Sequence, residues 1–149
     1  MNKHGLAGSI IFYSIVALSI AAMLLAILPW YSSFLQNKSL VQAENGYQVE
    51  ALHTAESAVF YNPFSIQALF VLAGNQQRIG RVVEARATLT KATELQPLNY
   101  ITWEQLALYE RDRWHEPEKA REHFEKAVSL NPLDKYLRKK AGVIDEQLP

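Results

Sequence analysis

The first third of the chain is dominated by one apolar run. Residues 6–30 are almost continuously apolar, and no Asp, Glu, Lys or Arg occurs between His4 and Asn37. A helix of this length rises about 37 Å, which is enough to cross a hydrocarbon core of about 30 Å with some tilt. The pattern predicts one transmembrane helix over residues 6–30, preceded by a short tail at residues 1–5.

A cleaved signal peptide is the competing interpretation of this run. Met1-Asn2-Lys3 has the character of a signal n-region. The apolar stretch, however, is longer than the usual h-region, and Pro29-Trp30-Tyr31 at its end offers no clear small-x-small cleavage site. The uncleaved anchor is therefore favoured.

The flanks of the predicted span indicate an orientation. Lys3 precedes the span, and the next basic residue is Lys38. The positive-inside bias then places the N-terminus in the cytoplasm and the rest of the chain outside it. Trp30, Tyr31 and Phe34 cluster at the exit, where aromatic side chains suit the headgroup region.

Small residues within the span indicate a possible packing face. Ser14, Ala17 and Ala21 share one side of the helix, which would allow another membrane helix to approach closely. The alternative is that Ala and Ser are simply common in membrane helices. No ionisable side chain lies in the span, so this helix alone does not predict a transport path.

The rest of the chain repeats itself. Three tetrads carry the same pattern at intervals of 34 and 35 residues, namely Asn62-Pro63-Phe64-Ser65, Gln96-Pro97-Leu98-Asn99 and Asn131-Pro132-Leu133-Asp134. Proline disfavours helix at the residue before it, and the last residue of each tetrad can cap a following helix. The pattern predicts helices that begin just after residues 65, 99 and 134, with the apolar residue anchoring each turn.

Apolar positions between the tetrads fall at helical spacing. Two successive units carry apolar residues at corresponding positions. The first unit has Leu69, Leu72, Ala73, Ala85, Leu89 and Ala92, and the next has Trp103, Leu106, Ala107, Ala120, Phe124 and Ala127. Such a pattern predicts pairs of helices that stack on their neighbours. Ala51, Ala55 and Ala58 form the second half of an earlier unit.

These residues resemble the tetratricopeptide repeat (TPR) family, whose pattern is Trp-x2-Leu-Gly-x2-Tyr followed by Ala-x3-Phe-x2-Ala-x4-Pro. The third unit matches it at Trp103, Leu106, Ala120, Phe124, Ala127 and Pro132. The unit departs from the pattern at Ala107 and Glu110, which replace glycine and tyrosine, and by one extra residue in the turn at 114–117. The resemblance covers about residues 48–132, within a predicted repeat region at 47–132, and implies an α-solenoid.

Two further helices are expected at the ends of the repeats. Residues 31–46 predict a juxtamembrane helix, with Phe34, Leu35, Leu40 and Val41 available to pack and a break at Asn45-Gly46. Residues 133–149 predict a capping helix with an apolar face at Leu137, Ala141, Ile144 and Leu148. The expected fold is all-α, with one transmembrane helix and about two and a half repeats.

A narrower resemblance concerns the membrane helix and the repeats together. The tetrads and the stretch Asn99-Tyr100-x2-Trp103 are similar to the C-terminal region of bacterial O-antigen ligase-like and polymerase-like membrane proteins. The catalytic membrane part of those proteins has no counterpart in this sequence. The resemblance implies an extracytoplasmic bacterial solenoid associated with a membrane complex.

The sequence offers little for catalysis. There is no cysteine, and the four histidines, His4, His53, His115 and His123, form no ligand pair and are expected on the surface. The acidic residues between 116 and 125 alternate with basic ones, as solvated helix faces do. We expect no catalytic, cofactor or metal site, no small-molecule substrate and, because 15 basic and 15 acidic residues balance, no nucleic-acid partner.

Stacked helix pairs form a groove lined by the first helix of each pair. The residues expected to line it are Gln67, Phe70, Gly74, Ile101, Glu104 and Leu108. This set lacks the Lys, Arg and Asn residues with which related TPR domains grip a peptide carboxylate, and favours an amphipathic helix or an apolar segment. The alternative is that these residues pack on the juxtamembrane helix.

Taken together, the patterns predict a non-enzymatic, single-pass bacterial membrane protein whose extracytoplasmic repeats mediate protein interaction or assembly. The partner is expected to be another membrane protein or copies of the same chain, alongside the lipid bilayer. Two alternatives remain open. One is a self-assembling pilin-like subunit, although the glutamate usual near the start of mature pilins is absent after Gly5. The other is an auxiliary subunit of a glycan polymerase or ligase.

Overall fold

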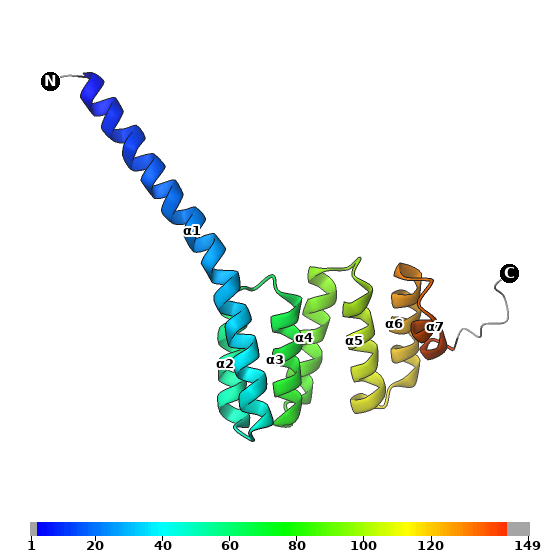
Figure 1. Ribbon diagram of the computed structural model, residues 1–149. Coiled ribbons are helices and arrows are strands. Elements are labelled where there is room, and N and C mark those ends of the chain that lie inside the picture. The colour runs from blue at the N-terminus through cyan, green and yellow to red at the C-terminus, as the bar shows by residue number, and fades with distance from the viewer. Residues whose placement is uncertain (1–2, 143–149) are drawn as a thin grey trace.

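The computed structural model describes residues 3–142, which form seven α-helices and one π-helical turn. No strand occurs in this range. Figure 1 shows helices α1 to α7 in chain order. Their bounds are α1 Lys3–Glu44, α2 Gln48–Tyr61, α3 Ile66–Arg78, α4 Val82–Leu95, α5 Tyr100–Tyr109, α6 Pro117–Leu130 and α7 Lys135–Lys140, and the π-turn η1 spans Glu110–Trp114.

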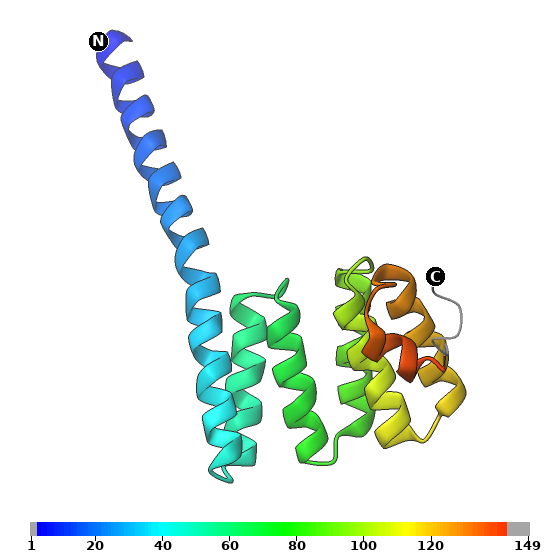
Figure 2. The ribbon, with the colours of Figure 1, turned by 45° about the vertical axis from the view of Figure 1, so that its right-hand side comes forward.

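The helices form a short solenoid with one long arm. The C-terminal half of α1 pairs with α2, α3 pairs with α4 and α5 pairs with α6, while the N-terminal half of α1 projects alone (Figures 1 and 2). The sequence predicted about two and a half repeats. The structure agrees: the C-terminal half of α1, where the juxtamembrane helix was expected, supplies the first helix of the earliest pair and docks on α2.

Helix α1 runs without a break through the boundary between the predicted transmembrane helix, residues 6–30, and the predicted juxtamembrane helix, residues 31–46. It passes through Pro29 without interruption and ends at Glu44. Proline removes one backbone hydrogen bond from a helix interior, but no glycine or polar turn accompanies it here. The end of α1 coincides with Gly46, whose φ of +86° lies in the left-handed region that favours glycine.

The buried face of the C-terminal half of α1 differs from the prediction. Of the four residues expected to pack, only Leu35 is buried, whereas Phe34, Leu40 and Val41 are 51%, 43% and 55% exposed. The face that packs on α2 instead combines Leu35 with small residues, Ser32, Ser39 and Ala43. Residues at this spacing share one side of a helix, and the larger side chains point away from it.

Small residues bring α1 and α2 close together. Ala51, Ala55 and Ala58 of α2 are completely buried. Ser32 Oγ donates a hydrogen bond to the Ala58 carbonyl and Ser39 Oγ donates one to the Ala51 carbonyl, both at 2.8 Å. Each buried hydroxyl is therefore satisfied by the partner helix, and the first pair packs through alanine and serine in place of large apolar side chains.

The predicted helix starts and caps are confirmed. Helices α3, α5 and α7 begin at Ile66, Tyr100 and Lys135. Ser65 Oγ accepts from the Ala68 amide at 3.2 Å, Asn99 Oδ1 from the Ile101 amide at 3.1 Å, and Asp134 Oδ1 from the Tyr136 and Leu137 amides at 2.9 and 3.2 Å. Each cap satisfies amides that the first turn of the helix leaves free.

Removing the cap of α3 tests its contribution. Ser65→Ala should lower the free energy of unfolding by about 1 kcal/mol, because an amide of the first turn loses its acceptor. Ser65→Asp keeps an acceptor oxygen and should restore most of the loss. Urea unfolding of the full chain in detergent, followed by circular dichroism, measures both variants; equal stability of Ser65→Ala and the parent chain would refute the cap's role.

The apolar residue of each tetrad does not anchor its turn, contrary to the sequence prediction. Phe64, Leu98 and Leu133 are 73%, 82% and 83% exposed. The turns are instead closed by the backbone: each tetrad's last residue donates its amide to the carbonyl of the first, at 3.0 to 3.3 Å. With proline and the cap in place, the turn needs no buried apolar side chain.

The extra residue of the third unit is absorbed where α5 ends. The chain widens into the π-turn η1, and His115 follows it with a φ of +53°. A π-turn accommodates an added residue within a helix. The Glu116 amide then donates to the Glu110 carbonyl at 3.2 Å, which closes the turn before α6.

The C-terminal cap is shorter than predicted within the described residues. Helix α7 ends at Lys140, and Gly142 follows with a φ of +74°. Glycine in this conformation terminates helices, and the sequence prediction ran the helix through it. Leu137 and Ala141 are buried against α6 in a cluster with Phe124 and Ala127, while Ile144 and Leu148 lie outside the described residues.

Candidate functional site

A cavity of about 220 Å³ opens between α3 and α5 on the groove side of the solenoid. Its walls combine apolar side chains with polar ends from α3, α5 and η1, and one residue of α4 lies at its base. The lining residues are Phe70, Ala73, Gly74, Gln77, Leu89, Gln105, Leu108, Tyr109, Asp112 and Arg113.

The structure places half of the predicted groove residues in this cavity. Phe70, Gly74 and Leu108 line it, whereas Gln67, Ile101 and Glu104 are not among its lining residues. The cavity lies toward the C-terminal ends of α3 and α5, whereas Gln67 and Ile101 lie in the first turns of those helices. Glu104 directly precedes the cavity-lining Gln105, but it lies near Asp134 instead. Whether a partner binds there stays a prediction.

Polar residues that the sequence analysis missed complete the cavity. Gln77, Gln105, Asp112 and Arg113 lie on its wall. Gln77, with its amide oxygen toward Arg113, accepts hydrogen bonds from Nε and Nη2 of Arg113 at 2.5 and 2.7 Å. Two features of the sequence could have indicated these residues: Glu110 replaces the tyrosine of the repeat pattern, and the turn after it has one extra residue. Both features displace the end of the helix that carries Asp112 and Arg113.

One ion pair lies beside the cavity. Arg111 Nε lies 2.6 Å from Asp112 Oδ1, and this hydrogen bond lowers the pKa of Asp112 and raises the pKa of Arg111. At the rim of the cavity, the Arg113 guanidinium is hydrogen-bonded to Gln77. Inside the cavity, Phe70 and Leu108 provide an apolar surface. Such a surface suits a segment with one apolar face and a few hydrogen-bonding groups.

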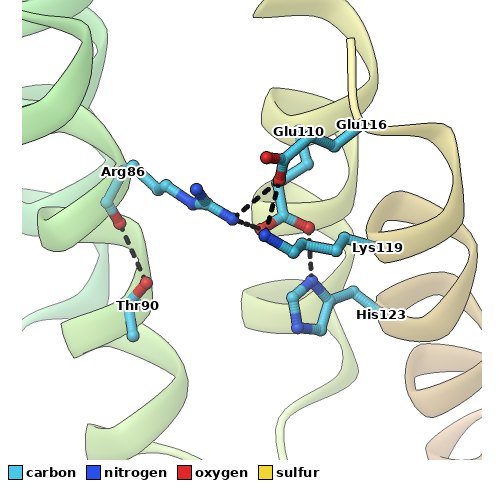
Figure 3. A network of polar contacts seen from close by, with 6 residues as sticks. All are labelled: Arg86, Thr90, Glu110, Glu116, Lys119 and His123. Carbon is cyan, nitrogen blue, oxygen red and sulfur yellow. Dashed lines mark hydrogen bonds and ion pairs between the residues drawn. The ribbon is translucent and has the colours of Figure 1, made fainter. Parts of the chain in front are cut away.

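Behind the groove lies an ionic cluster that the sequence did not predict (Figure 3). Glu110 is only 2% exposed, and its two carboxylate oxygens contact Arg86 Nη2 and His123 Nδ1, both at 2.7 Å. Arg86 also contacts Glu116 at 3.1 Å, and Glu116 pairs with Lys119 at 3.0 Å. The cluster joins α4, η1 and α6.

Two sequence expectations are therefore wrong in this region. Glu116 is half-buried and paired within the cluster, although it was assigned to a solvated face. His123 was expected on the surface, but its ring is half-buried against Glu110 and lies 5.6 Å from the Trp103 ring. Glu110 stands where the repeat pattern has tyrosine. Its counterion is Arg86, which directly follows Ala85, one of the alanines of the pattern.

The cluster shifts two ionisation equilibria. The hydrogen bond with Glu110 raises the pKa of Arg86. The hydrogen bond from Lys119, with Arg86 nearby, lowers the pKa of Glu116. Because folding lowers the pKa of this carboxyl, its stabilising effect is present above the unfolded-state pKa and is lost as the pH falls through the folded-state value.

Glu104 of α5 shows the opposite shift and provides a pH-dependent prediction. Burial, followed by repulsion from Asp134, raises its pKa. Charged Glu104 therefore opposes folding, so Glu104→Gln should raise the melting temperature slightly at pH 7. At about pH 3 the carboxyl is protonated in both states and the difference should vanish. Thermal scans at both pH values test this; a loss of stability at pH 7 would contradict the sign.

The predicted packing face on α1 is open. Ser14, Ala17 and Ala21 lie on the projecting half of the helix and are exposed. Their role in helix packing stays a prediction. Within residues 3–142, no group of three or more His, Cys, Asp or Glu side chains is arranged to hold a metal ion.

Solved structures with the same arrangement of helices are TPR domains. The first TPR of Spaghetti (RPAP3), bound to the HSP90 peptide SRMEEVD, has a TM-score of 0.62 at 14% identity and covers 74% of this chain and 87% of its own. The Sgt2 TPR domain from Aspergillus fumigatus has a TM-score of 0.63 at 18% identity over 74% of each chain. The Yersinia enterocolitica type III secretion chaperone SycD, in complex with a peptide of the translocator YopD, has a TM-score of 0.60 at 12% identity and covers 74% of this chain and 88% of its own.

These similarities show the fold alone, since the identities are low. No family model matches the sequence, and no curated protein matches it. The resemblance to O-antigen ligase-like proteins gains no support from them. The repeat spacing, the helix pairs and the structural neighbours agree on one conclusion about the fold: the helices that follow the projecting half of α1 form a TPR-like solenoid.

Proposed function

We propose that this chain is a non-enzymatic, single-pass membrane protein whose TPR solenoid holds a segment of another membrane protein and so supports assembly of a complex. The observation that carries the proposal is the division of α1. Its C-terminal half is the first helix of the solenoid, whereas its N-terminal half projects from it with no partner helix (Figure 1).

The projecting half of α1 has the surface expected of a lipid-facing helix. An 18-residue window has a mean hydropathy of 2.6 and no residue buried within the protein. Large side chains along it, such as Phe12, Leu18 and Leu25, are 62% to 74% exposed. An apolar surface this long is not stable in water, and a bilayer would cover it.

The orientation forms part of the same proposal. Lys3 lies before the apolar segment and Lys38 follows it, which favours a cytoplasmic N-terminus in a bacterial cell membrane. The solenoid and its groove would then lie outside the cytoplasm.

The groove between α3 and α5 supports protein binding. Its apolar wall at Phe70 and Leu108 and its polar rim at Gln77, Gln105 and Arg113 combine features that hold an amphipathic segment. The first TPR of Spaghetti (RPAP3) and the secretion chaperone SycD, which have a similar fold, were each solved with a peptide bound. The Arg111–Asp112 ion pair and the hydrogen bonds between Gln77 and Arg113 at the rim favour an apolar anchor over a strongly charged ligand.

Photo-crosslinking tests the proposed groove. A photoreactive amino acid at Gln105, which lines the cavity, should crosslink to one defined membrane protein in native membranes. The same group at Lys91, which is exposed on α4, is the matched control and should give no such product. Leu108→Asp should reduce the Gln105 product at least tenfold, because it places a charge in the apolar wall.

Three outcomes decide between the candidates. A single partner captured from Gln105 and not from Lys91 supports the proposal. Crosslinks from Gln105 to another copy of the chain would indicate self-assembly through the groove. Equal yields from both positions, or a detergent-solubilised chain that runs as a lone monomer with no product, would contradict the proposed role.

A further inference from the structure

The inter-repeat loops of the solenoid all lie along one edge, and this edge faces the side from which α1 projects (Figures 1 and 2). We name it the loop edge and define it as residues 59–66, 93–101 and 129–136. Each of its three loops exposes one large apolar side chain, Phe64, Leu98 or Leu133, at 73% to 83%. Phe60 adds a fourth, at 78%.

The first of these loops lies level with the end of the apolar segment of α1. Tyr31 packs edge-on against Tyr61, with ring centroids 4.8 Å apart, and Ser32 bonds to the Ala58 carbonyl. The chain turns into the loop immediately after Tyr61. The Trp30 side chain, 68% exposed, therefore marks the same level as the loop that carries Phe64.

The opposite edge of the solenoid has a different character. It consists of the α1–α2, α3–α4 and α5–α6 turns, here residues 43–50, 77–84 and 111–119, and contains eleven Asp, Glu, Lys and Arg residues. The loop edge is of equal length and contains three, Glu94, Asp134 and Lys135. The Asp134 carboxylate accepts hydrogen bonds from the first amides of α7 and so caps that helix. Only the loop edge combines few charges with large exposed apolar side chains.

We propose that the loop edge rests on the surface of the bilayer that α1 spans, with Leu98 and Leu133 inserted at the headgroup level. The inference rests on the proposed membrane anchor. Because α1 continues into the first repeat without a flexible linker, it fixes which edge faces the membrane. Membrane helices are commonly tilted by about 20°, and a tilt toward the solenoid would bring the distant loops closer to the surface.

This arrangement explains one observation that the solenoid alone leaves without a cause. The large apolar side chains exposed at the turns, Phe64, Leu98 and Leu133, are unfavourable in water but stable at a lipid interface. The groove-lining helices α3 and α5 would stand upright on the membrane, so that the groove runs along its surface. The cavity would lie at the end of the groove away from the bilayer, because Gln77, Asp112 and Arg113 on its wall belong to the opposite edge.

Single cysteines with an environment-sensitive fluorophore test the inference in the full chain, which has no native cysteine. The chain is reconstituted in phosphatidylcholine vesicles with or without a mixture of lipids that carry a nitroxide either near the headgroup or near the end of an acyl chain, so that both shallow and deep labels can be quenched. Leu98→Cys and Leu133→Cys report the loop edge. Val83→Cys, 66% exposed on the opposite edge, is the matched control, and Ile20→Cys reports the anchor.

We expect the nitroxide lipids to quench labels at 98 and 133 at least twofold more than the label at 83. Quenching at 20 with no excess at 98 and 133 would overturn the inference and leave the anchor intact. Absence of quenching at 20 would overturn the anchor and the inference together. A blue-shifted but unquenched label at 98 or 133 would show that protein, and not lipid, covers the loop edge.

Discussion

Arg86→Ala is expected to lower the free energy of unfolding by about 3 kcal/mol, because it leaves the carboxylate of Glu110 buried without its main counterion. The Arg86 side chain is a quarter exposed, which places the effect at the lower end of the range for buried pairs, while Glu110 is almost fully buried. The guanidinium also lies 4.8 Å from the Trp114 ring, a contact that the variant loses as well.

A surface ion pair provides the control. Arg121 pairs with Glu125 at 2.9 Å, but both side chains are at least half exposed, so Arg121→Ala should cost about 0.5 kcal/mol or less. Urea unfolding of the full chain in detergent, followed by Trp fluorescence and circular dichroism, measures both variants. Equal losses for Arg86→Ala and Arg121→Ala would show that the buried cluster is not a stabilising feature.

The second large effect is expected from Phe124→Ala, at about 4 kcal/mol. Phe124 is 1% exposed and packs among Ala107, Ala127 and Leu137, where it joins α5, α6 and α7. Small alanine neighbours leave little side-chain volume to relax into the space, so the cavity would persist. Loss of this contact should unfold the third repeat first, since repeats are stabilised mainly by their neighbours.

Phe60 is the matched control for this substitution. It is 78% exposed, and Phe60→Ala should change the free energy of unfolding by less than about 0.5 kcal/mol. Trp103 packs against the Phe124 cluster and reports its unfolding by fluorescence. A Phe124→Ala chain as stable as Phe60→Ala would contradict the packing described for the third repeat.

Local signals in the sequence were sufficient for much of the fold. The tetrads fix the starts of α3, α5 and α7, because proline and a capping side chain act within a few residues of the helix end. The spacing of 34 and 35 residues between tetrads predicts the stacked helix pairs, because each interval is the length of one helix pair. Alanines at corresponding positions, such as Ala58 and Ala92, are completely buried as the pattern predicts.

Features that depend on distant residues were not predictable in this way. Glu110 looks like a substituted pattern tyrosine, and its pairing with Arg86 and His123 arises only once α4 and α6 pack beside it. The π-turn η1 likewise places Arg113 on the groove wall by displacing the end of α5. Gln67, Ile101 and Glu104, half of the candidate groove residues, are not among the residues that line the cavity.

The central proposal is that one continuous helix both spans the membrane and begins the solenoid. Reaction with a membrane-impermeant maleimide tests it most directly, using Ile20→Cys and Asn37→Cys in intact cells. Both side chains are exposed on α1, so the protein itself shields neither. We expect rapid labelling at 37 and none at 20 until detergent is added. Labelling at 20 as fast as at 37 would contradict the membrane span, and protection of both would contradict the proposed extracytoplasmic solenoid.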